Sequence, residues 1–482
     1  MISLGVDLLT KFLNLMSSNV SESDLELIQL GKSLGLDLVS FADLRASQED
    51  DFVDQVREIA LQKMKHNKDN YLKRSDCFYV GSIDFMVFDE PAGKKFFLLE
   101  TNGGSHRGLS ILTKKQQSLL YNGYLEAIFQ AIEKNKKDDK KIFIIVGVPI
   151  NDGLIHEKVI MIEYLRKNLK AKNRTVKIFN LDNYDKGFKA EIIFLIADYK
   201  QLLKHLSFSQ NWVVFDEEKV NVLIGDGIAR RIDIPKFNNM INQDFRGINT
   251  IIINPIFKIT DDKSLTYLAS YFSRKKLNKY RLKYLIFTKA YNEKDLASKV
   301  DFVLKKYKKS FIIKPSGGSG GAGVMPIAQN EDNFHIRKII EESKKQFYTK
   351  FMSNRNPFPY TIQEKAEFSL IDWKERKHTF DLRIYLAQYN KKVIPIGGLA
   401  RIAKGSFIKG MNKQEFVVNL SGYNGQIEIE RGIGLSQRSC ELLNLSIDDF
   451  ANMFCIGCLL FKCMTQNYKK IISFTKWDKL LV

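Results

Sequence analysis

The sequence of 482 residues has little cysteine, and its cysteines are not spaced as a disulfide framework. Five cysteines are too few to cross-link a chain of this length, so we expect a reducing compartment and predict a cytoplasmic protein. Cys455 and Cys458 have the spacing of redox or metal-binding pairs, but they stand inside the apolar run 453–464. Because cysteines in such runs usually pack as small hydrophobic side chains, we interpret this pair as structural.

Long hydrophobic runs are missing as well. The run 453–464 is too short to cross a bilayer, so we expect no membrane partner. The amino-terminal stretch contains Lys11 among its apolar residues and has no basic start, so we expect no signal peptide. The hydrophobic fraction of 44% is nevertheless typical of a globular protein.

The chain also lacks a long block of one charge sign. Its 75 lysines and arginines exceed its 55 aspartates and glutamates, and the net charge of +20 favours an anionic partner, either nucleic acid or a phosphorylated small molecule. The densest basic run, 134–141, is interrupted by Asp138 and Asp139, which is typical of a solvated linker. We therefore expect no specific nucleic-acid partner.

The most informative stretch is an apolar run and a lysine that lead into a glycine-rich loop. Residues 311–313 predict a buried strand with Lys314 at its end, and residues 324–327 predict a second strand. The five glycines between them let backbone N–H groups approach an anion: Gly317, Gly318, Gly320, Gly321 and Gly323. The loop has neither the Walker spacing nor a dinucleotide fingerprint, because the lysine comes first and no helical pattern follows. It predicts a hairpin lid over a nucleotide, and a mobile surface hairpin is the alternative.

A second hairpin carries oxygen ligands. Residues 79–88 and 95–102 predict two strands joined by a turn at 89–93. Glu100 and Asn102 leave the same face of a strand, as a carboxylate and an amide that share one hard cation would need. Depending on the register, Asp84 lies opposite Leu99 or Glu100. The hairpin predicts a metal site, and a solvated strand end is the alternative.

The length of the chain predicts two or three domains. Residues 141–148, 156–169 and 176–179 read as strand, helix and strand, which predicts a βαβ layer with a parallel sheet that 192–197 and 212–215 continue. Helical patterns occupy 21–34 and 49–66, and helix returns from Cys440 onward.

Several cationic side chains are placed to bind anions. Lys263 stands in the first turn of a predicted helix, where its charge opposes the helix dipole unless a phosphate is bound. Arg383 and Arg401 follow apolar strand residues, so we expect them to rise from a sheet and grip phosphate or carboxylate. Arg230 and Arg231 stand beside acids, which indicates either surface pairing or anion binding.

Two further strands are predicted nearby. Residues 360–365 form a strand against which a base could lie, and 416–419 form a short strand near the end of this region.

In their order along the chain, these motifs resemble the ATP-grasp superfamily, and specifically the circularly permuted ATP-grasp ligases of bacteria. They span about seven-tenths of the chain, from residue 84 to residue 419. The matching motifs are Phe97-Leu98-Leu99-Glu100-Thr101-Asn102 with Gly108, Arg230-Arg231-Ile232-Asp233, Asp261-Asp262-Lys263, Ile313-Lys314-Pro315 with the glycine loop, Gln363-Glu364, Asp381-Leu382-Arg383, Gly397-Gly398-Leu399-Ala400-Arg401 and Asn419. In an unpermuted member the Glu-x-Asn pair follows the arginines, whereas here it precedes the glycine loop.

The resemblance implies a multidomain α/β and α+β protein with an ATP-grasp fold in permuted order, in which two α+β subdomains hold ATP. It divides the chain into a helical segment (1–75), a permuted metal-binding part (76–135), an α/β pre-ATP-grasp domain (140–260), the nucleotide-binding subdomains (261–435) and carboxy-terminal helices (436–482).

The resemblance also implies a function, an ATP-dependent ligase that forms a carbon–nitrogen bond between a carboxylate and an amine through an acylphosphate. Its implied cofactors are ATP and Mg²⁺, and its implied partners are small-molecule or peptide substrates. The resemblance does not decide whether the protein forms a homo-oligomer. Asp84, Glu100 and Asn102 would hold Mg²⁺, and Arg383, Arg401 and Lys263 would be catalytic. The residues implied to bind ATP are Lys263, Lys314, Ser316, Gly317, Gly318, Gly320, Gly321, Gly323, Gln363 and Glu364.

The sequence departs from the family pattern on the acceptor side. Ser82 replaces an arginine, His106 and Arg107 replace a Pro-Ser pair, and 420–425 is less glycine-rich than expected. The substrates therefore do not follow from the resemblance. Two alternatives stay open: phosphoryl transfer to His106 or a small acceptor, and a non-catalytic protein that binds nucleotide or nucleic acid.

Overall fold

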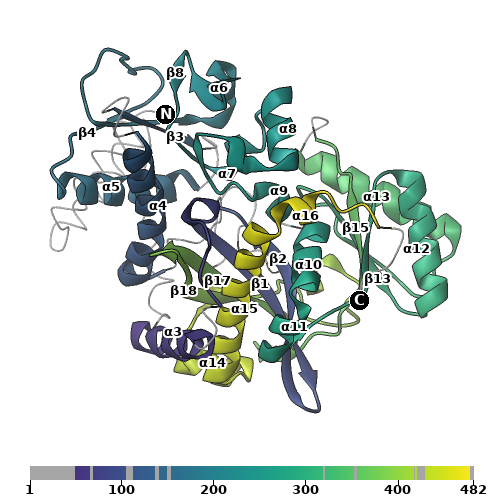
Figure 1. Cartoon of the computed structure of the whole chain (residues 1–482). Helices are drawn as coiled ribbons and strands as arrows, with labels where there is room; N and C mark the ends of the chain where they lie inside the picture. Colours follow the sequence, from purple (N-terminus) through teal and green to yellow (C-terminus); the bar gives the residue numbers. More distant parts are fainter. Residues whose placement is uncertain are drawn as a thin grey trace, which may run out of the picture.

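The computed structural model describes residues 49–65, 69–104, 112–135, 141–148, 154–318, 321–351, 355–416, 418, 420 and 429–477. Within these ranges the protein is a mixed α/β, multidomain structure built on four sheets (Figure 1). The predicted helix at 21–34 lies outside the described residues.

The largest sheet joins strands that are far apart in the sequence. It has seven strands in the order β11-β2-β1-β17-β18-β19, with β16 paired to β17. The hairpin β1–β2, predicted from the sequence, is confirmed, and its register places Asp84 opposite Glu100. On its other side Asp84 faces Arg383 of β17, and Asp381 of β17 faces Arg401 of β18. The strands are β1 Val80–Glu90, β2 Gly93–Asn102, β11 Leu282–Lys283, β16 Leu370–Trp373, β17 Arg376–Tyr389, β18 Lys392–Ile402 and β19 Gly432–Gly434.

Helices cover both faces of this sheet. Ile83 and Phe85 of β1 belong to the core that contains α15, whereas Val80 and Tyr385 belong to the core that contains α4. Since strand residues alternate between faces, Asp84 lies on the α4 side. The helices are α3 Asp50–Lys65, α4 Lys114–Lys134, α14 Gln437–Leu443, α15 Ile447–Gln466 and α16 Tyr468–Ile472, which confirms the predicted helices at 49–66 and after Cys440.

The five cysteines are buried free thiols. Cys455 and Cys458 point into the core around α15, and burial raises the pKa of Cys455 to about 12. In the part of the chain that the structure describes, no helix is both long and apolar enough to span a bilayer.

The predicted βαβ layer is confirmed as a five-stranded parallel sheet in the order β10-β9-β3-β5-β4. Its strands are β3 Ile142–Val148, β4 Val176–Phe179, β5 Ile192–Asp198, β9 Val222–Ile224 and β10 Ile251–Ile253. The nearby helices are α5 Leu154–Lys170, α6 Tyr199–His205, α7 Asp226–Ala229 and α8 Pro235–Gln243.

One predicted strand does not join the parallel sheet. Residues 212–215 form β7 Trp212–Phe215, which instead pairs with β6 Leu206–Ser209 and β8 Glu218–Lys219 in a separate antiparallel sheet. Tight turns with positive φ at Gln210, Asn211, Asp216 and Glu217 reverse the chain on both sides of β7, and this local pairing is why it stays apart.

The glycine loop belongs to a small sheet with the order β12-β15-β13-β14. The predicted hairpin is confirmed, because Phe311 pairs with Ile327 and Ile313 pairs with Met325. Two helices, α12 Glu293–Tyr307 and α13 Asn333–Phe351, share its hydrophobic core and form a layer with it in Figure 1. The strands are β12 Phe287–Ala290, β13 Phe311–Pro315, β14 Met325–Ile327 and β15 Tyr360–Glu364.

Three short helices lie between β10 and β11 in the chain, and the second of them contacts strands of both the large and the small sheet: α9 Phe257–Asp261, α10 Lys263–Phe272 and α11 Arg274–Leu277. The predicted strand at 416–419 is not formed by its described members, since Phe416 lies in a turn and Val418 lies outside any strand. Val417 and Asn419 lie outside the described residues.

Candidate nucleotide-binding site

A cavity of about 540 Å³ lies where the large sheet, the small sheet and the parallel sheet meet. It brings together eleven of the predicted site residues: Asp84, Glu100, Asn102, Lys263, Lys314, Gly317, Gly318, Gly321, Gln363, Arg383 and Arg401. A larger cavity, of about 760 Å³, lies at the amino-terminal edge of the parallel sheet and is lined by none of them.

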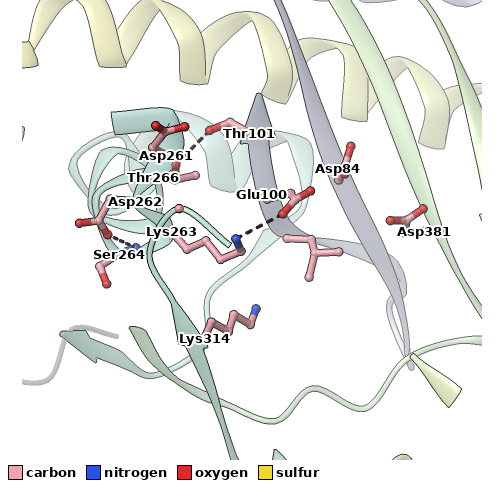
Figure 2. A network of polar contacts seen from close by, with 12 residues as sticks. Asp84, Glu100, Thr101, Asp261, Asp262, Lys263, Ser264, Thr266, Lys314 and Asp381 are labelled. Carbon is pink, nitrogen blue, oxygen red and sulfur yellow. Dashed lines mark hydrogen bonds and ion pairs between the residues drawn. The ribbon is translucent and has the colours of Figure 1, made fainter. Parts of the chain in front are cut away.

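Glu100 and Lys263 meet across this cavity from two different elements. The carboxylate of Glu100, on β2, lies 3.4 Å from Lys263 Nζ (Figure 2). Asp262 caps α10 by accepting hydrogen bonds from the backbone N–H groups of Ser264 and Leu265, which fixes the start of the helix and therefore the place of Lys263. The predicted position of Lys263 in a first helical turn is confirmed.

Lys314 enters the cavity from the end of β13 and is buried. Its Nζ donates hydrogen bonds to Gln363 Oε1 (2.5 Å) and to the Tyr267 hydroxyl (3.0 Å), and both of these partners are uncharged. Burial lowers the pKa of Lys314 to about 7, and the nearby charge of Lys263 acts in the same direction. An anion bound beside Lys314 would stabilise its charged form.

Only part of the glycine loop lines the cavity, including Gly317, Gly318 and Gly321. Gly317 has a φ of +63°, and a Cβ there would meet nothing within 4 Å. Its N–H donates to the Asp261 carbonyl oxygen (3.2 Å), and the Ser316 N–H donates to the carbonyl oxygens of Pro357 and Pro359. These two N–H groups are therefore engaged by the protein in this conformation.

Three of the loop residues predicted to bind nucleotide do not appear among those lining the cavity. The backbone N–H of Ser316 donates to carbonyl oxygens in the turn before β15, and Gly320 lies outside the described residues. Gly323 has a φ of +72°, and a Cβ there would lie 2.8 Å from the Ser343 carbonyl oxygen. This glycine lets the loop pack against α13.

Gln363 and Glu364 point in different directions, as neighbours on a strand do. Gln363 lines the cavity and accepts the hydrogen bond from Lys314. The carboxylate of Glu364 is not among the lining groups, since it accepts from the Ile286 N–H (3.2 Å) and pairs with Lys309. The structure thus brings only the first residue of this predicted pair to the cavity.

A buried cluster of two carboxylates and two arginines forms another wall of the cavity. Arg383 donates to both oxygens of Asp84, each at 2.7 Å. Arg401 donates to Asp84 Oδ2 and to Asp381 Oδ1, also at 2.7 Å. The strand register explains the cluster, since all four residues lie on one face of β1, β17 and β18.

Burial and the arginines have opposite effects on the two carboxylates, and the outcome differs between them. Burial alone would raise the pKa of Asp84, but the charges of Arg383 and Arg401 lower it well below its usual range. Burial raises the pKa of Asp381 to about 6, against the opposing effect of Arg401. Arg383 and Arg401 pair with carboxylates of the protein itself, and their predicted binding of a ligand anion stays a prediction.

The predicted Mg²⁺ ligands fall into two groups. Both oxygens of Asp84 accept hydrogen bonds from arginines, so in this conformation Asp84 serves the cluster. Glu100 is 32% exposed and lines the cavity with Asn102, whose buried Nδ2 has no hydrogen-bond partner. Among the described residues, no group of three or more His, Cys, Asp or Glu side chains could hold a metal.

Glu100 and Asn102 nevertheless fit a magnesium ion. Mg²⁺ is commonly held by one or two protein oxygens together with substrate phosphates and water. The unpartnered Asn102 Nδ2 is a hydrogen-bond donor and would suit an acceptor such as a phosphate oxygen, whereas the Asn102 amide oxygen and the Glu100 carboxylate are the groups that would hold Mg²⁺.

Sequence reasoning missed several residues in or beside the cavity. Tyr267 does not line the cavity but accepts a hydrogen bond from Lys314; it stands one helical turn after Lys263, so the same face of α10 could have indicated it. Arg355 and Tyr199 line the cavity without belonging to any motif. Arg230 pairs with Asp261 at 3.1 Å, which confirms the ion-pair interpretation of the arginine motif, and it also lines the cavity; anion binding stays a prediction.

Comparison with protein-family models and with curated protein sequences finds no match. Three solved structures are similar over much of the chain. A protein assigned as a gamma-glutamylcysteine synthetase from Methylobacillus flagellatus KT is 13% identical with a TM-score of 0.46, covering 90% of this chain and 98% of that one.

The second similar structure, a glutathione synthetase-like effector from Globodera pallida, is 13% identical with a TM-score of 0.39 and coverages of 79% and 93%. The third, D-alanyl-alanine synthetase A from Vibrio cholerae, is 11% identical with a TM-score of 0.34 and coverages of 64% and 79%. All three TM-scores are below 0.5, so these similarities assign neither fold family nor activity to this chain.

Proposed function

We propose that this protein is an ATP-dependent ligase with a circularly permuted ATP-grasp fold, which joins a carboxylate to an amine through an acylphosphate. One observation carries the proposal: Glu100 and Asn102 of the large sheet share a cavity with Lys263, Lys314 and the glycine hairpin. Oxygen groups that could hold a metal and basic side chains that could bind phosphate therefore share one space, with Glu100 3.4 Å from Lys263 Nζ. The five buried free thiols support a reducing compartment, the cytoplasm, for this reaction.

Lys263 and Lys314 would bind the phosphates of ATP, with backbone at Gly318 and Gly321 beside them. The lowered pKa of Lys314 supports this role, because a phosphate returns the charge that burial disfavours. Gln363 would hold Lys314 in place from β15, where the base could also lie.

Glu100 and Asn102 would hold Mg²⁺, whose chemistry here is to neutralise negative charge on the phosphates. Side chains of the protein would orient the acid substrate. The carboxylate oxygen of the substrate attacks the γ-phosphorus, and ADP leaves. The amine next attacks the acyl carbon, loses a proton and displaces inorganic phosphate. Because Asp84, Asp381, Arg383 and Arg401 are buried and paired with one another, we assign this cluster the role of a rigid wall that positions the substrate.

The test is ADP release from ATP and Mg²⁺ with pooled acids and with hydroxylamine as the amine. Hydroxylamine traps an acylphosphate as a hydroxamate, so the natural amine need not be known. We expect ADP and hydroxamate in equal amounts with at least one acid pool. Bound ATP without ADP release from any pool would contradict the proposal.

Glu100→Gln is the matched variant. It keeps the size of the side chain and removes its charge, so we expect ATP binding to persist and turnover to fall by about a hundredfold or more. Asp89→Asn, in an exposed ion pair at the tip of the same hairpin, is the control that should turn over like the original protein.

A further inference from the structure

Three arginines line one end of the same cavity. Arg230 and Arg231 follow α7, at the carboxyl edge of the parallel sheet, and Arg355 follows α13. Lys263 and Lys314 reach the cavity from other elements, α10 and β13. We call Arg230, Arg231 and Arg355 the arginine cluster.

Each guanidinium of the cluster is held in place by the protein. Arg231 donates to the Gly227 carbonyl oxygen and lies 4.6 Å from the centre of the Tyr199 ring. Arg355 Nη1 donates to the Gly317 carbonyl oxygen at 3.1 Å, and Arg230 Nη2 lies 3.1 Å from Asp261. Such anchoring preorganises the guanidinium groups for binding.

Positive groups outnumber negative groups in the cavity. It is lined by eight lysine and arginine side chains and by four carboxylates; the arginine cluster supplies three of these cations, and Asp261 pairs with one of them. Asp84 and Asp381 lie against Arg383 and Arg401, and Glu100 lies near Lys263. Asp261 is therefore the cavity carboxylate that serves the arginine cluster.

The crowding of cations has a measurable consequence. Burial, followed by the charges of Arg355 and Arg230, lowers the pKa of Arg231 to about 10. Burial and Arg230 lower the pKa of Arg355 as well. An anion bound between these groups would relieve their repulsion.

The place of the cluster also fits a ligand. Gly147 of β3 and Gly227 of α7 line the cavity beside it, and ligands of open α/β sheets bind beyond the carboxyl ends of the strands. A guanidinium group binds a carboxylate or a phosphate through two parallel hydrogen bonds.

We propose that the arginine cluster binds a second anionic group of the acid substrate. The substrate class is then acids that carry, besides the reacting carboxylate, another carboxylate or a phosphate. This inference rests on the proposed function for the meaning of the reacting carboxylate, but the anion site itself is tested separately.

The test measures anion binding by calorimetry to protein saturated with Mg²⁺ and a non-hydrolysable ATP analogue, so that the triphosphate site is filled. Glutarate and inorganic phosphate are the dianionic probes, and acetate is the monoanionic one. We expect one or both dianions to bind about tenfold or more tightly than acetate, and the stronger of the two identifies a carboxylate or a phosphate. Dianions that bind no better than acetate would overturn the inference.

The variants are Arg231→Gln and the double variant Arg231→Gln, Arg355→Gln. We expect the double variant to bind dianions only as well as acetate, and Arg231→Lys, which keeps the charge, to retain part of the preference. Arg174→Gln changes an exposed arginine paired with Glu191 in the same domain and should leave binding unchanged. Dianion binding that survives in a folded double variant would overturn the inference.

A kinetic arm separates the two proposals. Once an acid substrate has been identified, we expect Arg231→Gln to raise the KM for that acid about tenfold and to leave kcat and the KM for ATP nearly unchanged. A raised KM for ATP alone would instead assign the cluster to the nucleotide and overturn the inference. Arginine-dependent anion binding without ADP release from any acid would contradict the ligase proposal and leave the anion site standing.

Discussion

At the scale of single residues, Lys314 shows how burial controls charge. Its two hydrogen-bond partners are uncharged, and burial with Lys263 nearby lowers its pKa to about 7. In the free protein it is therefore protonated below pH 7 and largely neutral above. A bound phosphate favours the protonated form, so nucleotide binding and proton uptake are linked.

We expect the affinity for ATP to weaken as the pH rises above 7, by up to about tenfold per pH unit, since binding must then protonate Lys314. Calorimetry in buffers of different ionisation enthalpy would measure the proton uptake directly. Lys314→Met should weaken binding and abolish this pH dependence, whereas the exposed Lys305→Met should preserve it. Equal proton uptake in Lys314→Met would assign the linkage to another group.

Asp84 is the residue on which the buried cluster depends. Removing its charge leaves Arg383 and Arg401 with one carboxylate less, so Asp84→Asn should lower the free energy of unfolding by about 3–5 kcal/mol. Asp89→Asn, which breaks an exposed pair with Lys94, should change it by less than about 1 kcal/mol. Urea denaturation at pH 7 measures both.

The pH dependence of the same variant has a definite sign. The folded pKa of Asp84 is lowered, so its stabilising contribution is present above the unfolded pKa and is lost as the pH falls toward the folded value. The difference in stability between the original protein and Asp84→Asn should therefore shrink below about pH 4. A constant difference down to pH 2 would contradict the assignment.

At the scale of elements, the glycine hairpin uses glycine for two reasons: positive φ at both Gly317 and Gly323, and close backbone contact at Gly323. Gly317 and Gly323 both have positive φ, but only Gly323 is pressed against other backbone. Gly317→Ala should cost about 1–2 kcal/mol of unfolding free energy from backbone strain alone. Gly323→Ala adds a clash with the Ser343 carbonyl oxygen and should cost about 2–5 kcal/mol.

Thermal and urea denaturation of the two alanine variants would compare them directly. Equal losses would show that α13 moves to accommodate the added methyl group, contrary to our expectation. The pair is well matched, since both residues belong to one loop and receive the same side chain.

The elements themselves were largely predictable. Apolar strand residues on both sides of a turn indicated the β1–β2 hairpin, and the cap at Asp262 begins the helix whose first turn was predicted to contain Lys263. The sequence prediction placed β7 in the wrong sheet because a short apolar strand carries no information about its pairing partner. The tight turns on both sides of β7 pair it with β6 and β8 instead.

At the scale of the whole molecule, three sheets meet around one cavity, so a ligand that binds there should stabilise the folded protein. We expect Mg²⁺ with a non-hydrolysable ATP analogue to raise the free energy of unfolding by about 2.7 kcal/mol at one hundred times its Kd. At the same analogue concentration, the gain should be smaller in Lys314→Met, which binds more weakly, and should also diminish when EDTA removes Mg²⁺. Differential scanning calorimetry provides the measurement, and a melting temperature unchanged at saturating analogue would contradict it.

The candidate site could be predicted in part. Glu100, Asn102, Lys263 and Lys314 were identified from residue type and spacing, and the structure places them in one cavity. Arg355 was not identified, since a single arginine outside any motif leaves no pattern. The partners of Asp84 were not identified either, because they depend on strands about 300 residues away.

The sequence by itself determined the local pieces: the strands and helices that follow from apolar periodicity, the freedom of the glycine loop, and the types of charged group available. Only the tertiary structure decided which of these segments line the same cavity. It also decided that Asp84 binds two arginines and that Gln363 points into the cavity while Glu364 points away from it. The reason is physical. Periodicity and capping act over a few residues, whereas sheet register and burial, which set contacts and pKa values, arise from segments brought together only by folding.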